Sequence, residues 1–139
     1  MRRFVPLSLL LFLVVAGCGK DNKCEVHMGE TNFTIEPDSA RYPGLNNVGG
    51  YMYFTGGYRG VVVVRIAYDQ FVAFERTCPE DNVSVVEVSE EWGSQLLVCP
   101  ECGSRFIVAA DGIPADGSAT PCSLAQYSTS YSGGSLMVY

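Results

Sequence analysis

The chain is built around the stretch Cys99-Pro100-Glu101-Cys102-Gly103-Ser104, with Cys78-Pro79-Glu80 as its upstream counterpart. Each stretch places a cysteine beside a proline in a short turn, and 20 residues, largely strand-like in sequence, lie between Cys78 and Cys99. Cysteines two residues apart can turn both sulfurs to one side, which suits a metal ion or a redox disulfide. Two separate turns form one site only on a rigid scaffold. The rest of the domain is therefore predicted to be that scaffold.

From residue 33 onward the sequence alternates in the manner of β-strands and shows no helical period longer than one turn. β-branched residues fill much of 61–67, which is typical of a buried strand. Turn residues recur at intervals of about 8 to 12 residues. Strands are expected over 33–36, 51–55, 61–67, 71–74, 83–88, 95–98 and 105–108, followed by a loop over 110–122 and a closing hairpin over 124–139. This pattern predicts one all-β domain, a sandwich or barrel, over residues 33–139.

The N-terminus has the pattern of an export signal. Arg2 and Arg3 precede an apolar run of 13 residues, which is shorter than the roughly 20 residues that span a bilayer. The run ends in Val15-Ala16-Gly17-Cys18, which resembles a bacterial lipoprotein processing site. On that resemblance, residues 1–17 are a signal peptide and Cys18 is lipidated. This implies a lipid anchor in the membrane of the bacterial cell envelope, outside the cytoplasm, and an ordinary cleaved signal is the alternative.

Residues 18–32 are polar and lack periodicity, and we expect them to form a short tether that contains Cys24 and His27. The mature chain, 18–139, is long enough for one domain with one core. Removal of Arg2 and Arg3 leaves 15 acidic against seven basic residues, a net charge of −8. Recognition of nucleic acid requires a basic patch, so no nucleic-acid partner is expected.

Five of the six cysteines remain if Cys18 carries lipid. In an exported protein the default state of such cysteines is a disulfide, but an odd number leaves either a free thiol or metal ligands. A thioredoxin-like site would require a helix after Cys102, and a zinc ribbon would require a second Cys-x-x-Cys. The sequence shows neither, so the cysteine pattern alone leaves disulfides and metal ligation open.

The two cysteine stretches resemble the cluster-binding loops of Rieske iron–sulfur proteins. The resemblance covers about residues 49–139 and is most specific at Cys78-Pro79, at 99–106 and at Leu124-Ala125-Gln126-Tyr127. It implies a Rieske-like β-sandwich or barrel with two ligand loops at one end. In Rieske proteins, two cysteines and two histidines bind a 2Fe-2S cluster.

The ligand positions depart from the Rieske pattern. By position, Cys78 and Cys99 match the two cysteine ligands, whereas Glu80 and Cys102 occupy the places of the two histidines. His27 is the only histidine of the chain and lies in the expected tether. A cluster with two histidine ligands therefore cannot form within one chain.

Three occupancies of the site stay open. The first is a 2Fe-2S cluster on Cys78, Cys99 and Cys102, with Cys122 or Glu80 as the fourth ligand, because the resemblance places residues 118–122 beside the cluster. The second is a structural zinc ion on the same cysteines. The third is no metal, with disulfides or free thiols. We expect Cys78, Cys99 and Cys102 to converge at one end of the sheet and Cys24 to lie elsewhere.

The resemblance implies an electron carrier or redox accessory that works with an unidentified redox protein. The alternative is a structural or interaction module that kept the fold and lost the cluster. An enzyme acting alone is not expected, because the sequence shows no Ser–His or Cys–His pair for nucleophilic catalysis. The acidic residues near the loops are expected on a solvated surface, where they would also suit a basic partner: Glu75, Glu80, Asp81 and Glu101.

Overall fold

The structure is a computed structural model that describes residues 24–139. The predicted signal peptide and Cys18 lie outside the described residues. Short strands and two 3-10 helices form the regular structure of the described part, which confirms the predicted all-β class. The strands are β1 (Phe33–Ile35), β2 (Tyr51–Phe54), β3 (Val61–Ala67), β4 (Gln70–Glu75), β5 (Glu87–Ser89), β6 (Gly93–Val98), β7 (Arg105–Ile107), β8 (Ile113–Pro114), β9 (Gln126–Tyr127), β10 (Thr129–Ser132) and β11 (Ser135–Val138), and the helices are η1 (Pro43–Leu45) and η2 (Val108–Ala110). Between residues 24 and 139, no helix is long and apolar enough to cross a bilayer.

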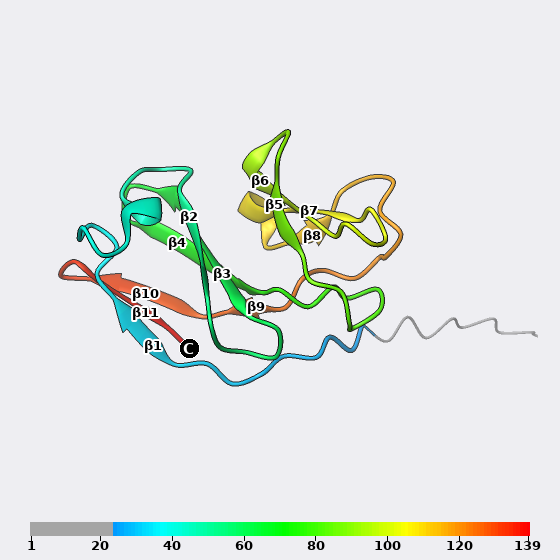
Figure 1. The fold of residues 1–139 in the computed structure, drawn as a ribbon, viewed down its shortest axis with the longest axis horizontal. Coiled ribbons are helices and arrows are strands. Elements are labelled where there is room, and N and C mark those ends of the chain that lie inside the picture. The colour runs from blue at the N-terminus through cyan, green and yellow to red at the C-terminus, as the bar shows by residue number, and fades with distance from the viewer. Residues whose placement is uncertain (1–23) are drawn as a thin grey trace, which may run out of the picture.

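The strands form three antiparallel sheets (Figure 1). The first sheet has the order β1-β11-β10, the second β2-β3-β4-β9 and the third β5-β6-β7-β8. Figure 1 shows the third sheet as a small lobe at the upper right and the first sheet at the lower left. The second sheet connects the two, since the chain passes from β1 of the first sheet into the second, from β4 into the third, and returns through β9 to β10 and β11 of the first.

The central strand β3 divides its side chains between two cores. Residues 61–64 are four successive valines, each at most 1% exposed. Val61 and Val63 pack in one core with residues of the first sheet, such as Leu136. Val62 and Val64 pack in the other core with residues of the third sheet. A strand covered on both faces has no polar side, and this explains the continuous run of β-branched residues.

The core between the second and third sheets contains two of the site cysteines. Cys78 and Cys99 are buried members of this core together with Phe74 and Phe106. Cys102 is partly buried and packs against it. Apolar packing therefore holds the ends of β4 and β6, from which the two cysteine loops start.

One expected strand is shorter than the sequence pattern suggests. The segment 83–88 alternates, but regular pairing begins only with β5 and is preceded by a single bridge between Thr77 and Val85. The reason is a turn at Asp81, whose Oδ1 accepts the backbone N–H groups two and three positions further on, each at 2.9 Å. The turn takes up the N–H groups of Val83 and Ser84, so that pairing is limited to residues 84–86 with residues 76–78.

The described part of the expected tether, residues 24–32, is attached to the domain. Asn82 Nδ2 donates to Glu25 O at 2.9 Å, and Asn82 Oδ1 accepts the His27 N–H at 3.0 Å. The hydroxyl of Tyr127 lies 2.8 Å from another carbonyl of the segment. Figure 1 shows this blue segment running toward the end of the molecule where the two cysteine loops lie. These residues therefore belong to the folded domain.

Candidate metal centre

Cys78 lies in the loop between β4 and β5. Its backbone N–H donates to Ser84 O at 2.8 Å, and its carbonyl accepts the Asn82 N–H at 2.9 Å. Asn82 has a left-handed backbone with φ of 54°, a conformation that asparagine adopts more readily than most residues. The loop thus closes on Cys78 and holds it just beyond the end of β4.

Cys99 and Cys102 lie in the turn between β6 and β7. The Cys99 N–H donates to Ser104 O at 2.9 Å, and the Cys99 carbonyl accepts the Gly103 N–H at 2.8 Å. Gly103 has φ of 73°, which glycine adopts without the steric penalty of a Cβ atom. The turn therefore returns the chain to β7 and keeps both cysteines at the same end of the hairpin.

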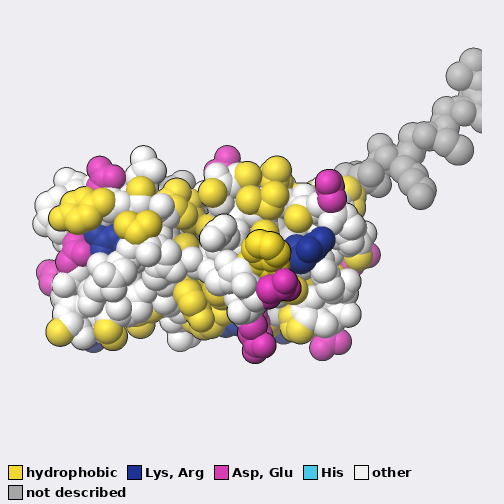
Figure 2. Space-filling model, turned by 90° about the horizontal axis from the view of Figure 1, so that it is seen from above, with side chains coloured by type: hydrophobic (Ala, Val, Ile, Leu, Met, Phe, Trp, Pro, Cys, Tyr) yellow, Lys and Arg dark blue, Asp and Glu magenta, His cyan; other side chains and the backbone are white. Residues whose placement is uncertain are grey.

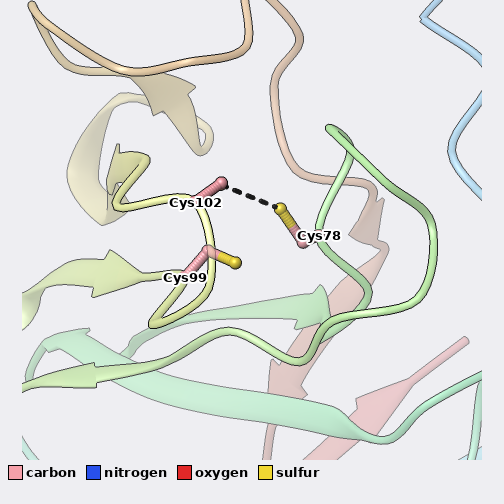
Figure 3. A group of neighbouring side chains, drawn as sticks. All are labelled: Cys78, Cys99 and Cys102. Carbon is pink, nitrogen blue, oxygen red and sulfur yellow. Dashed lines mark hydrogen bonds between the residues drawn. The ribbon is translucent and has the colours of Figure 1, made fainter.

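The sulfur atoms of Cys78, Cys99 and Cys102 converge between the two loops (Figure 3). All three Sγ atoms lie within 4.8 Å of one another. Cys78 Sγ lies 3.7 Å from Cys102 Sγ, across the gap between the loops. Cys78 and Cys99 have 0% exposed surface, and Cys102 is half-buried. The predicted convergence is confirmed, and the role of these cysteines as metal ligands stays a prediction.

Burial and hydrogen bonding act differently on two of the thiols. Burial is the main cause that raises the pKa of Cys78 far above its usual range. Burial also acts to raise the pKa of Cys102, but hydrogen bonds from the side chain and backbone of Ser104 and from the neighbouring thiols outweigh it. The pKa of Cys102 therefore lies below its usual value. Metal binding requires thiolates, so a bound cation would draw the protons off the buried thiols as well.

Two serines tie a further loop to the cysteine turn. Ser104 Oγ lies 3.2 Å from Cys102 Sγ and accepts the Ala119 N–H at 3.0 Å. Ser118 Oγ accepts the Arg105 N–H and donates to the Arg105 carbonyl, each at 3.0 Å. Ser104 is fully buried, so its hydrogen bonds are shielded from water. The loop that precedes β9 is thereby held beside the cysteines.

Cys122 does not join the three thiols, which corrects the prediction that named it, beside Glu80, as a candidate for the fourth ligand. Cys122 forms a disulfide with Cys24, 98 positions away in sequence, and their Cα atoms are 5.4 Å apart. The sulfur of a disulfide is not a thiolate and is therefore not available as a metal ligand. The prediction that Cys24 lies outside the group is confirmed. The N-terminal segment runs back to the end of the domain that carries the loops, and this brings the two cysteines together.

Glu80 and His27 both lie outside the group of three sulfurs. Among residues 24–139, the side chains close enough to share one metal ion are the three cysteines. Glu80 is exposed, and its carboxylate lies outside the group. His27 is also exposed, and its ring centroid lies 5.1 Å from that of Tyr58. The carboxylate of Glu80 would have to turn inward to serve as a ligand.

Glu75 was expected on a solvated surface, and this expectation is wrong. The residue is 0% exposed at the end of β4. Its Oε1 accepts the Arg59 N–H at 2.8 Å and both the N–H and the hydroxyl of Thr77, at 3.2 and 2.8 Å. Its Oε2 accepts the Tyr58 N–H and the Tyr127 hydroxyl, each at 2.7 Å. Five donors therefore surround a buried carboxylate that lies close to the first cysteine loop.

Hydrogen bonding keeps this carboxylate ionised. Burial acts to raise the pKa of Glu75, but the bonds from the Tyr58 N–H and the other donors outweigh it, and the pKa lies below the usual 4.5. Gly57 has φ of 60°, and a Cβ atom there would lie 2.3 Å from Glu75 Oε2. The pair Gly56-Gly57 is the sequence signal for this arrangement, because a glycine turn leaves backbone N–H groups free to bind an anion.

Comparison with solved structures identifies similar folds. No protein-family model and no curated protein matches the sequence. Among solved structures, the plasma membrane Rieske protein PetC3 from the cyanobacterium Synechocystis PCC 6803 is similar, with a TM-score of 0.56 and 22% identity over 79% of this chain and 99% of that chain. The fold is Rieske-like. The ferredoxin of carbazole 1,9a-dioxygenase from Nocardioides aromaticivorans IC177 has a TM-score of 0.47 and 23% identity over 66% of this chain and 86% of that chain.

The donor set of this Rieske-like domain differs from two cysteines and two histidines but suits a metal with thiolate ligands. The single histidine of the chain is exposed in the N-terminal segment. Tetrahedral coordination with metal–sulfur bonds of about 2.3 Å places sulfurs roughly 3.8 Å apart. The 3.7 Å between the sulfurs of Cys78 and Cys102 agrees with this spacing. The residues therefore fit a metal centre that takes three thiolate ligands from this chain.

Proposed function

We propose that this protein is an electron carrier or redox accessory with a 2Fe-2S centre bound by Cys78, Cys99 and Cys102. The observation that supports the proposal is the convergence of three sulfur atoms on two loops of a Rieske-like fold. When bound, such a centre supplies one-electron transfer. The chain itself contributes a water-poor site, because two of the three cysteines have 0% exposed surface.

The ligands would have unequal access to solvent. Cys78 and Cys99 lie in the core, whereas Cys102 is half-buried. Glu80 stays the candidate for the fourth ligand, because it lies two residues after Cys78, at the position of a histidine ligand in the Rieske pattern. Three thiolates and a carboxylate carry more negative charge than two thiolates and two neutral imidazoles. The reduction potential is therefore expected below that of Rieske centres.

The N-terminal sequence supports a proposal for the location of the protein. We propose that the mature protein starts at a lipidated Cys18 and is anchored in the bacterial cell envelope, outside the cytoplasm. Its net charge of −8 without the signal favours a redox partner with a basic surface. Figure 2 shows acidic side chains spread over the visible face, where basic side chains form only small patches. Mass spectrometry of the membrane-extracted protein should show an acylated Cys18, and an unmodified Cys18 would contradict the anchor.

A structural zinc site is the second candidate. Three sulfurs within 4.8 Å of one another suit a single tetrahedral ion, whereas a 2Fe-2S cluster spreads its ligands over two irons. Zinc has no redox chemistry in proteins, so the domain would then be a structural or interaction module.

Metal analysis of anaerobically purified protein separates the two candidates. The proposal predicts about two irons and two acid-labile sulfides per chain, with visible absorption that bleaches on reduction. About one zinc per chain with no visible absorption would support the second candidate. A folded protein that contains neither metal would contradict both.

A further inference from the structure

Three of the five cysteines in residues 24–139 are unpaired and lie together, whereas the other two form a disulfide. Cys78 Sγ and Cys102 Sγ are 3.7 Å apart on facing loops (Figure 3). A disulfide bond holds its sulfurs at about 2.05 Å. The two side chains therefore need only a short approach to become bonded.

We propose that Cys102 and Cys78 form a thiol–disulfide exchange site for low-molecular-weight disulfides, and that the resulting Cys78–Cys102 disulfide and a bound metal exclude each other. The exchange itself requires only the two thiols. The exclusion of metal rests on the proposed function.

Exposure assigns the roles of the two thiols. Cys102 is half-buried, whereas Cys78 and Cys99 have 0% exposed surface, so a small disulfide R–S–S–R reaches Cys102 first. The Cys102 thiolate attacks one sulfur of that disulfide, and the other sulfur leaves as RS⁻, which takes up a proton. The Cys78 thiolate then attacks Cys102 Sγ and displaces the second RS⁻. Two electrons pass from the protein to the small disulfide, and the two thiol protons are balanced by the two RSH formed.

Oxidation of this pair removes two metal ligands at once. Disulfide sulfurs are not thiolates, and Cys99 alone does not hold a metal ion that requires four ligands. A metal bound to the same thiolates in turn prevents their attack on a disulfide. The state of the site would therefore follow the thiol–disulfide balance of the surroundings, and a thiol reductant would restore metal binding.

The test uses the metal-free mature chain with the Cys24–Cys122 disulfide intact and oxidised glutathione as the small disulfide. Among residues 24–139, the number of titratable thiols should fall from three to one. Digestion without reduction, followed by mass spectrometry, should show a Cys78–Cys102 bond beside Cys24–Cys122. A bond from Cys99 to either of the other two, or three thiols that persist, would overturn the proposal.

Two variants and the metal-loaded protein complete the test. Cys99→Ser is expected to keep forming the Cys78–Cys102 bond although a ligand is lost, and Cys102→Ser is expected to stop it. Continued exchange in Cys102→Ser would overturn the assignment of the nucleophile. In metal-loaded protein, the Cys78–Cys102 bond should form only to the extent that the metal has been lost, and a bond formed while the metal stays bound would overturn the mutual exclusion. If the reduced protein binds no metal, the proposed function fails while the disulfide map still decides the exchange site.

Discussion

Glu75 is a buried anion that supports the start of the first cysteine loop. Three of its five donors are backbone N–H groups, which cannot withdraw without local unfolding: those of Tyr58, Arg59 and Thr77. Thr77 directly precedes Cys78 in the chain. The carboxylate therefore connects the Gly56-Gly57 turn to the segment that places the first cysteine.

Glu75→Gln is expected to lower the free energy of unfolding by about 1–3 kcal/mol. The amide keeps the shape of the side chain, but its NH₂ group would face N–H or O–H groups that donate hydrogen bonds to a carboxylate oxygen in the wild type. Glu101→Gln is the control, because Glu101 is exposed in the other loop, and it should change stability by less than about 0.5 kcal/mol. Urea denaturation measures both values. Equal effects would show that the network around Glu75 does not stabilise the domain.

The same carboxylate predicts a dependence of stability on pH. The pKa of Glu75 in the folded protein lies below its usual 4.5. A depressed pKa contributes stability that is present above the unfolded pKa and is lost as pH falls through the folded pKa. The wild type should therefore lose more stability than Glu75→Gln between about pH 5 and about pH 3. Unfolding free energies that fall in parallel for the two proteins would contradict this.

Gly57 and Gly133 allow a matched test of the close approach to Glu75. Their φ values are 60° and 58°, but a Cβ at Gly57 would lie 2.3 Å from the carboxylate, whereas a Cβ at Gly133 would have no atom within 4 Å. Both alanine variants carry the left-handed penalty of about 1–2 kcal/mol. Gly57→Ala should be destabilised further by about 1 kcal/mol or more, because it also meets the clash. Thermal unfolding that shows equal losses would contradict the close packing.

At the scale of elements, residues 24–27 form an N-terminal strap across two loops. Cys24 is bonded to Cys122 in the loop before β9, and Asn82 of the first cysteine loop contacts the backbone of the strap twice. The disulfide closes a loop over a separation of 98 positions. Long closed loops restrict the unfolded chain most in the entropic account of disulfide stabilisation.

The double variant Cys24→Ser, Cys122→Ser lacks the disulfide, and its free energy of unfolding is expected to be about 2–4 kcal/mol lower than that of wild type. The double variant is preferred to either single one because it leaves no new free thiol. Chemical denaturation under non-reducing conditions provides the comparison with wild type. A double variant as stable as wild type would show that the strap does not hold the domain together.

Local patterns explain which elements were predictable from sequence. The strands expected over 51–55, 61–67 and 105–108 agree with β2, β3 and β7, because local runs of β-branched and aromatic residues between turn residues are typical of a strand. The pairing of Cys24 with Cys122 was not predictable, since it depends on the path of the N-terminal segment over a separation of 98 positions. The burial of Glu75 was missed for the same reason, as two of its donors lie 16 and 17 positions away.

At the scale of the whole molecule, the site lies where two sheets meet. Cys78 follows β4 of the second sheet, and the turn with Cys99 and Cys102 connects strands of the third. The core between these sheets includes Cys78 and Cys99. The packing of the sheets therefore sets the distance between the loops. The resemblance to Rieske loops anticipated this arrangement, but it did not exclude Cys122 as a ligand.

The double variant Glu80→His, Cys102→His tests whether the two cysteine loops lie opposite each other. The variant would restore two thiolates and two imidazoles at the Rieske positions and should raise the reduction potential of a bound cluster. Missing hydrogen-bond partners for the new imidazoles are expected to weaken binding by about 10- to 100-fold. After reconstitution with iron and sulfide, electron paramagnetic resonance of the reduced protein should show a Rieske-type signal. A folded double variant that takes up no cluster would count against two cysteine loops that lie opposite each other.

The most direct test of the three-cysteine centre is the metal content per folded chain in wild type and in two matched variants, all purified anaerobically. Wild type should contain bound metal, Cys99→Ser should lose it, and the Cys24→Ser, Cys122→Ser double variant should keep it, because the disulfide cysteines are not ligands. Circular dichroism verifies that each protein is folded. Folded wild type without metal, or loss of metal in the disulfide variant equal to that in Cys99→Ser, would contradict a centre built on Cys78, Cys99 and Cys102.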